Sequence, residues 1–238
     1  MRRSGTRSAR RRELERLAAS ALLAVTSGCA SSNPLDPPDG EPAAAPLPYA
    51  SSVVSFEPGD EAGFGENDLP EVVLGPPHGG GTEAGSLDVL SLGKGGSIVL
   101  AFEPYAIVDG EGVDLVVFEN AFWPGGDPSA VFAEPGEVSV SEDGEAWHAF
   151  PCDAAGDGEG HFAGCAGVTP TQKYDAKSLV PLDAAASGGD AFDLAELGLE
   201  RVRFVKIRDR SNAGAAPSAG FDLDAVGIAR AERTDAEP

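Results

Sequence analysis

Five carboxylates lie close to apolar runs, a placement that suits the binding of a hard cation. Glu119 ends the run LVVFE, while Asp222 and Asp224 alternate with apolar residues in GFDLDAV, so that on a strand they share one face. With Asp109 and Asp114 they offer the carboxylate oxygens that calcium prefers, and calcium takes about six to eight oxygen ligands. No Asp-x-Asp-x-Asp-Gly loop is present. These five residues form the candidate calcium site.

The polar pair Glu119 and Asn120 also has a purely structural interpretation. Residues 114–119 read as a strand that is apolar on both faces, so the pair lies where the chain leaves a buried sheet. A carboxylate in that position must be hydrogen-bonded, ion-paired or metal-bound, because a buried unpaired charge is costly. The alternative to calcium is therefore that both side chains tie down the following loop, residues 121–135, through hydrogen bonds.

Aromatic side chains in that loop indicate a ligand-binding surface. Phe122 and Trp123 follow Asn120 directly and precede two glycines, an arrangement that suits stacking on a sugar ring beside a polar group. Trp147 follows a predicted hairpin at a position that we expect to face inward, and it is assigned to the core. Asn120, Phe122 and Trp123 are thus the predicted ligand-binding residues.

Catalysis has little support in the sequence. His78, His148 and His161 are the three histidines, and none lies in a nucleophile or metal motif. Glu119 and Glu134 would suit a glycosidase pair, but acidic residues are so abundant that such a pair is expected by chance. The sequence therefore predicts a protein that is not an enzyme.

The beginning of the chain predicts export. Seven arginines precede the apolar stretch LAASALLAV at 17–25, which is shorter than the roughly 20 residues of a membrane span. The following residues, TSGC, resemble the lipobox of bacterial lipoproteins, although Thr26 stands where that motif usually has Leu. The resemblance implies a signal peptide at 1–28, a lipidated Cys29 and a bacterial envelope protein, periplasmic or surface-exposed, as on an outer membrane. A plain signal peptide cut near Ser27 or Ala30 is the alternative.

Two further cysteines, Cys152 and Cys165, remain once Cys29 is set aside. An even number of cysteines in an oxidising compartment predicts one disulfide. The alternative is a pair of free buried thiols. Zinc is disfavoured because His161 would supply only a third ligand.

The charge of the chain limits its partners. It has 17 Lys and Arg against 39 Asp and Glu, a net charge of −22 at pH 7, and seven of the arginines lie in the signal peptide. Nucleic acid and anionic membrane surfaces are therefore poor partners. We expect contact with a membrane through the lipid anchor only.

Short apolar or alternating runs separated by Gly, Pro and Asp predict an all-β sandwich. Residues 29–51 are Pro- and Ala-rich and read as a tether, 52–231 as one domain and 232–238 as a disordered tail. Long loops are expected at 58–85 and 151–190, and a helical turn at 193–198. The predicted strands are 53–57, 86–92, 97–103, 114–119, 137–141, 146–150, 202–208 and 223–229, with a hairpin turn at Asp143-Gly144.

Four segments in order, DLVVFENAF, EPGEVSVSEDGEAW, FDLAELGLERVRFVKIRD and GFDLDAVGIA, resemble an uncharacterised group of bacterial lipoproteins and cell-surface proteins. The second half is similar to the discoidin or galactose-binding-like jelly roll. The resemblance implies that fold, with long loops and a structural calcium near a sheet edge, but no particular activity.

These observations predict a non-catalytic, lipid-anchored envelope protein that binds a glycan or a surface protein through its loops. One alternative is a structural or adhesion protein of the envelope without a small ligand. The other is a glycan-acting hydrolase, which would require Glu119 and Glu134 to meet in an open cleft.

Overall fold

The computed structural model describes residues 49–156, 162–172, 182 and 184–234. The predicted signal peptide, Cys29 and the tether up to residue 48 lie outside the described residues, as do residues 235–238 of the predicted tail. No helix in the described ranges has the length and apolar character needed to cross a membrane.

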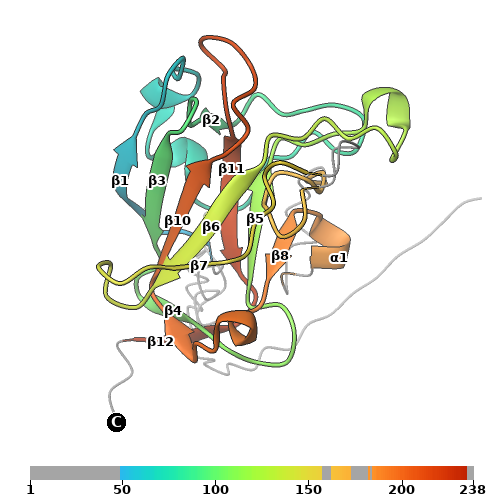
Figure 1. Cartoon of the computed structure of the whole chain (residues 1–238). Coiled ribbons are helices and arrows are strands. Elements are labelled where there is room, and N and C mark those ends of the chain that lie inside the picture. Colours follow the sequence, from blue (N-terminus) through green and yellow to red (C-terminus); the bar gives the residue numbers. More distant parts are fainter. Residues whose placement is uncertain (1–48, 157–161, 173–181, 183, 235–238) are drawn as a thin grey trace, which may run out of the picture. The chain divides into compact units, whose positions relative to one another are not determined.

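Two main antiparallel sheets form a β-sandwich, which confirms the predicted all-β class (Figure 1). One sheet has the order β1 (Ser52–Glu57), β3 (Ser97–Ala101), β10 (Phe204–Asp209), β6 (Gly136–Ser141) and β7 (His148–Ala149). The other has the order β2 (Leu90–Ser91), β11 (Asp222–Ile228), β5 (Leu115–Glu119) and β8 (Asp190–Phe192). A small third sheet lies at one end and contains β12 (Ala231–Arg233), β4 (Tyr105–Val108) and β9 (Arg201–Val202).

The helical elements are single turns in the connections between strands. The expected turn at 193–198 is present as η4 (Leu194–Leu197), where the Asp193 carboxylate accepts the Ala195 N–H at 2.9 Å and Gly198 ends the turn with a φ of 65°. The others are η1 (Glu66–Asp68), η2 (Glu71–Val73), η3 (Pro124–Gly126) and α1 (Ala184–Ser187).

The central strand β5 is buried on both faces, as its apolar run predicts. Leu115 and Val117 belong to the core between the sheets, whereas Val116 and Phe118 pack on the opposite face. Tyr49 packs against that second face, and each fully buried side chain of this size contributes about 1.5–3 kcal/mol. Because Tyr49 and Ala50 are buried, the folded domain includes residues that the sequence assigned to the tether.

The domain also extends further at its C-terminal side than predicted. The strand β12 pairs with β4 and reaches Arg233, two residues past the expected end at 231. The strands β4, β8 and β12 were not expected, and the predicted strand 202–208 is divided between β9 and β10. Of the predicted strand 86–92 only Leu90–Ser91 pairs in a sheet. These short elements depend on their partners, since their own sequences carry no clear alternation.

Candidate functional site

Three loops meet where β5 ends, in a region that we call the loop end (residues 78–86, 119–123 and 171–172). The Asn120 amide oxygen accepts the Ser86 N–H, and the Trp123 N–H donates to the Thr82 carbonyl at 2.7 Å. The Thr171 hydroxyl donates to the Glu119 carbonyl at 2.8 Å. Residues 119 and 120 thus fix two chain segments far apart in the sequence, and Asn120 anchors the loop that contains Ser86 and not the predicted loop 121–135.

A carboxylate cluster lies beneath the loop end, formed by Glu119, Glu134, Asp209 and Asp222, all of them buried. Glu119 is 1% exposed, and its Oε1 accepts the Asp222 N–H at 3.4 Å. No described residue donates a hydrogen bond to its Oε2. Burial, and then the charges of Asp222 and Glu134, raise the pKa of Glu119 well above its ordinary value. Glu119 therefore keeps one buried carboxylate oxygen that no described donor compensates.

The other members of the cluster differ in their partners. Asp209 is satisfied, because its carboxylate accepts the N–H groups of Phe221 and Gly95, both at 2.9 Å. Asp222 accepts hydrogen bonds from the Ser91 hydroxyl and, at 3.5 Å, from the Asn120 amide. Burial and the charges of Asp222 and Asp209 raise the pKa of Glu134 to about 8. No hydrogen bond from a described residue offsets these effects at Glu134, so the charge that needs compensation lies at Glu119 and Glu134.

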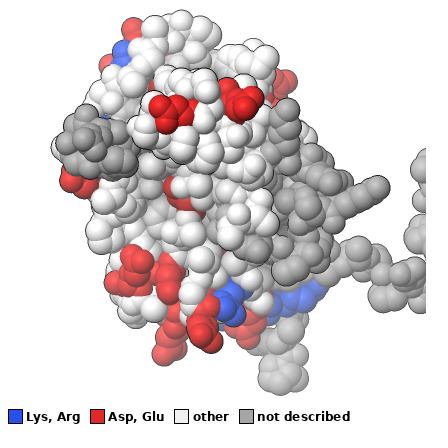
Figure 2. Space-filling view, turned by 90° about the vertical axis from the view of Figure 1, so that its right-hand side faces the viewer, with Lys and Arg blue, Asp and Glu red and all other residues white. Residues whose placement is uncertain are grey.

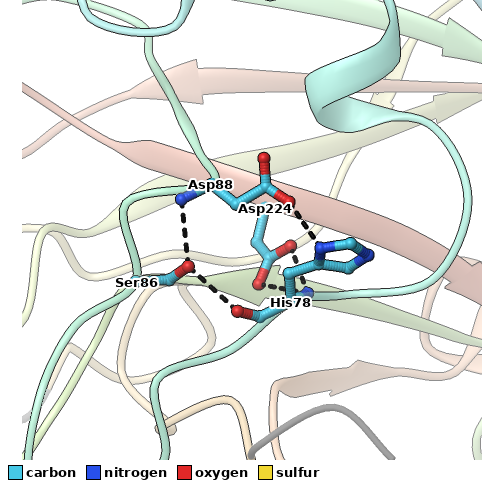
Figure 3. A network of polar contacts seen from close by, with 4 residues as sticks. All are labelled: His78, Ser86, Asp88 and Asp224. Atoms are coloured by element: carbon cyan, nitrogen blue, oxygen red, sulfur yellow. Dashed lines mark hydrogen bonds and ion pairs between the residues drawn. The ribbon is translucent and has the colours of Figure 1, made fainter. Parts of the chain in front are cut away.

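Asp224 belongs to a separate polar network, shown in Figure 3. A β-bulge between Leu223 and Ala225 makes Asp224 the extra residue of β11, and its carboxylate accepts the His78 N–H at 2.8 and 3.0 Å. Burial raises the pKa of Asp224 to about 7, and the charge of Asp88 acts in the same direction. The expectation that Asp222 and Asp224 serve one ion from one face of a strand is therefore wrong.

The same network contains Ser, His and Asp side chains without the geometry of a catalytic triad. The Nδ1 of His78 lies 2.5 Å from the Asp88 carboxylate. The Ser86 hydroxyl, however, donates to the main-chain carbonyl of His78 at 2.9 Å and accepts the Asp88 N–H at 3.0 Å, so the imidazole does not serve as its base (Figure 3). The network connects loop 78–88 to β11.

Asp109 and Asp114 lie at the opposite end of β5 from Glu119. Asp114 precedes the strand and Glu119 ends it, and five residues of extended chain span about 16 Å. Carboxylate oxygens of Asp109, Asp114 and Asp193 lie within 4.8 Å of one another, the one such group of three among the described residues. The Arg230 Nε is 3.5 Å from Asp114 and already supplies positive charge there. The five predicted ligands therefore cannot share one calcium ion: Glu119 and Asp222 are neighbours at the loop end, and Asp109 and Asp114 are neighbours at the opposite end of β5.

The predicted aromatic residues lie at the loop end, but not as two open platforms. The ring of Phe122 stacks on Phe132 with centroids 5.0 Å apart, so one of its faces is occupied. Trp123 is half-buried beside a cavity of about 370 Å³ lined by 80–84 and Gln172. Trp147, assigned to the core, is instead half-buried on the outer face of the five-stranded sheet, with the Lys206 ammonium 4.1 Å from its ring centre.

The two cysteines pair as predicted. A disulfide joins Cys152 to Cys165, with an S–S distance of 2.07 Å.

The two glutamates of the hydrolase alternative are buried. Glu119 and Glu134 are 1% and 3% exposed, so neither carboxylate faces an open cleft. The condition that the sequence set for a hydrolase is not met by this pair.

Sequence reasoning missed Glu134 and Asp209 as members of the cluster. Asp209 ends the strand FVKIRD in the way that Glu119 ends LVVFE, and this repeated pattern could have indicated that Asp209 belongs to the cluster.

No family model matches the chain, and no curated protein sequence matches it either. Function must therefore be inferred from the geometry of these residues.

Proposed function

We propose that this protein is a non-catalytic, lipid-anchored protein of the bacterial envelope, built on a galactose-binding-like jelly roll, that binds a glycan or a surface protein at its loop end. Calcium held by Glu119 and Asp222 organises the binding loops. The observation that carries the proposal is the buried Oε2 of Glu119, which has no described hydrogen-bond donor at the point where the loops meet.

The donor set of the carboxylate cluster suits calcium. Its ligand groups are the carboxylate oxygens of Glu119, Asp222 and Glu134 and the hydroxyl oxygen of Ser91, and hard cations prefer oxygen ligands. A divalent cation replaces the repulsion among these carboxylates by attraction and offsets the cost of burying Glu119. The Asn120 side chain contacts both Asp222 and the Ser86 N–H. A cation that fixes the position of Asp222 therefore also fixes the loop at Ser86.

The anchor is supported by the arginine-rich leader, the apolar stretch at 17–25 and Cys29. The Cys152–Cys165 disulfide fits the oxidising compartment to which such a leader directs a protein. We expect Cys29→Ala to move the protein from the membrane fraction to the soluble fraction of its bacterial host. Unchanged membrane association of this variant would rule out the lipid anchor.

Ligand binding at the loop end is tested with Trp123→Ala on the folded domain. Trp123 is half-buried beside the loop cavity, so its removal takes away contact surface without opening the core. We expect binding to isolated cell walls or to a glycan array to fall about tenfold or more, as for the loss of an aromatic anchor. Glu232→Ala, a truncation of an exposed residue on β12 in the small third sheet, serves as the control and keeps binding.

Two outcomes would decide against this proposal. If Trp123→Ala binds as well as the wild type while its melting temperature is unchanged, the ligand does not lie at the loop end. If the wild-type domain binds no glycan and no envelope component, the protein is the structural or adhesion protein without a small ligand.

A further inference from the structure

The loop cavity, which is the cavity of about 370 Å³ beside Trp123, has walls that are largely main chain. Gly80, Gly81 and Ala84 line it, and the Gly81 N–H donates to the Thr171 carbonyl at 3.1 Å. A Cβ atom at Gly80 would lie 2.2 Å from the Ala84 carbonyl oxygen, so the chain folds back on itself more closely than a side chain would allow. The shape of the loop cavity is therefore set by the backbone before a ligand binds.

Three polar side chains that line the loop cavity are not used within the described protein. They belong to Thr82, Glu83 and Gln172, and none of them forms a hydrogen bond or an ion pair with another described residue. Two of these residues are held through their main chain, because the Thr82 carbonyl accepts the Trp123 N–H at 2.7 Å and the Gln172 N–H donates to the Ser187 carbonyl at 2.9 Å. Their polar side chains thus stay available to a ligand.

The hydrogen-bonding capacity of these side chains indicates hydroxyl groups as their partners. The Gln172 amide and the Thr82 hydroxyl both donate and accept hydrogen bonds, whereas the Glu83 carboxylate only accepts them. An ammonium group only donates, so it would leave the Gln172 amide N–H groups without an acceptor, and a carboxylate only accepts, so it would leave Glu83 without a donor. Sugar hydroxyls donate and accept, so they can satisfy all three side chains.

The charge around the loop cavity disfavours an anionic ligand. The described residues of the loop end include no Lys or Arg, and the exposed Glu83 has no described basic partner. The protein carries a net charge of −22, and on the side drawn in Figure 2 acidic side chains are spread widely while basic ones appear at few places. Both the local and the overall charge therefore repel a ligand that carries carboxylates, sulfates or phosphates.

The size of the loop cavity suits a short piece of a glycan more than the face of another protein. Its volume of about 370 Å³ lies at the lower end of the range for small-molecule sites, about 300–1,000 Å³. A specific protein interface buries about 800 Å² on each partner, which is a much larger surface. The half-buried Trp123 beside the cavity offers aromatic surface for the apolar face of a sugar ring.

We propose that the loop cavity binds an uncharged glycan and that Glu83 sets this specificity. The Glu83 carboxylate accepts hydrogen bonds from sugar hydroxyls and repels sugars that carry carboxylate groups, while Gln172 and Thr82 bind further hydroxyls. This specificity rests on the function proposed for the loop end, and of the two ligands named there it selects the glycan.

The test is a glycan array that pairs uncharged oligosaccharides with their uronic-acid and amino-sugar counterparts, followed by titration of each glycan that binds. We expect the wild-type protein to bind an uncharged glycan at least about fivefold more tightly than its uronic-acid counterpart, the effect of two like charges about 4 Å apart in water. In Glu83→Gln this preference should disappear, because the repulsion is removed while the side chain still forms hydrogen bonds.

Glu196→Gln is the matched control and should keep the wild-type preference. Glu196 is exposed on η4, at the opposite end of the sandwich, and its replacement changes the net charge by the same amount. Unchanged melting temperatures show that each variant is folded.

Glu83 does not set the specificity if the wild type binds uronic-acid glycans as tightly as uncharged ones, if Glu83→Gln keeps the preference, or if only amino sugars bind. Loss of binding in Trp123→Ala together with an unchanged preference in Glu83→Gln would overturn the role of Glu83 alone. Glycan binding that depends on neither residue would also overturn the function proposed for the loop end. If no glycan binds, the uncharged glycan is ruled out and a surface protein is left as the ligand.

Discussion

Glu119 and Asn120 are neighbours in sequence but have different roles at the end of β5. The Asn120 side chain receives one hydrogen bond and donates another, so it is satisfied and holds a loop. Glu119 receives one long hydrogen bond from β11 and keeps a buried oxygen without a described partner. An uncompensated buried carboxylate costs several kcal/mol, a cost that a bound cation would offset. Asn120 is therefore a loop anchor, whereas Glu119 is a candidate calcium ligand.

Melting the domain in calcium and in chelator tests this assignment. We expect calcium to raise the melting temperature by about 5–10 °C at a hundredfold excess over Kd, since such binding contributes about 2.7 kcal/mol. Glu119→Gln should remove this response, and in chelator it should melt at or above the wild-type temperature because repulsion with Asp222 is reduced.

Asp193→Asn, at the opposite end of the sandwich, is the control and should keep the response to calcium. If calcium has no effect and Glu119→Gln lowers the melting temperature, Glu119 acts as a hydrogen-bond acceptor only. If Asp193→Asn abolishes the response, the ion binds beside Arg230 and not at the carboxylate cluster.

At the scale of elements, the longer strands could be predicted because their side chains alternate or are wholly apolar. The strands β1, β3, β5, β6, β10 and β11 all coincide with predicted runs. The strands β4, β8 and β12 contain three or four residues and form because a partner strand is present, which no local pattern reveals. Sequence patterns therefore find the sandwich and miss its smaller sheet.

The candidate site was predicted only in part, for reasons of register and long-range pairing. The neighbouring positions of Glu119 and Asp222 follow from the pairing of β5 with β11. The bulge that turns Asp224 toward His78 could not be deduced, because an extra residue leaves no mark on the alternation. Trp147 was placed on the wrong face because it precedes β7, whose two residues are too few to show on which side of the sheet it lies. Lys206 and Arg208 alternate with buried residues, so their shared outward face was readable from the strand itself.

At the scale of the whole molecule, buried acids link stability to pH. Burial raises the pKa of Glu134 to about 8, of Asp224 to about 7 and of Asp190 to about 6, from ordinary values near 4. Between the ordinary and the raised pKa, the folded protein binds more protons than the unfolded chain. The free energy of unfolding therefore falls as pH rises through this window, until these groups are deprotonated in the folded protein.

In chelator, we expect the domain to melt at a higher temperature at pH 5.5 than at pH 8.5. Glu134→Gln should flatten this dependence most clearly between about pH 6 and pH 8, where folded Glu134 keeps a proton that the unfolded chain has lost. Asp127→Asn is the control, because hydrogen bonds from Ser129 lower the pKa of this exposed residue and it does not titrate in that range. A melting temperature that rises with pH in the wild type would contradict the raised pKa values.

The bulge in β1 disfavours strand pairing between neighbouring copies of the protein. β1 forms one side of the five-stranded sheet and pairs only with β3, and its register shifts between Val53 and Ser55. An extra residue bends and twists such a strand, which makes its free backbone groups a poor template for a strand of another copy. Val54, at the shift, is 55% exposed, and Glu57 at the strand end adds a charge that two facing copies would bring together. Even at the crowding that a membrane anchor would impose, this side of the sandwich resists intermolecular sheet formation and aggregation.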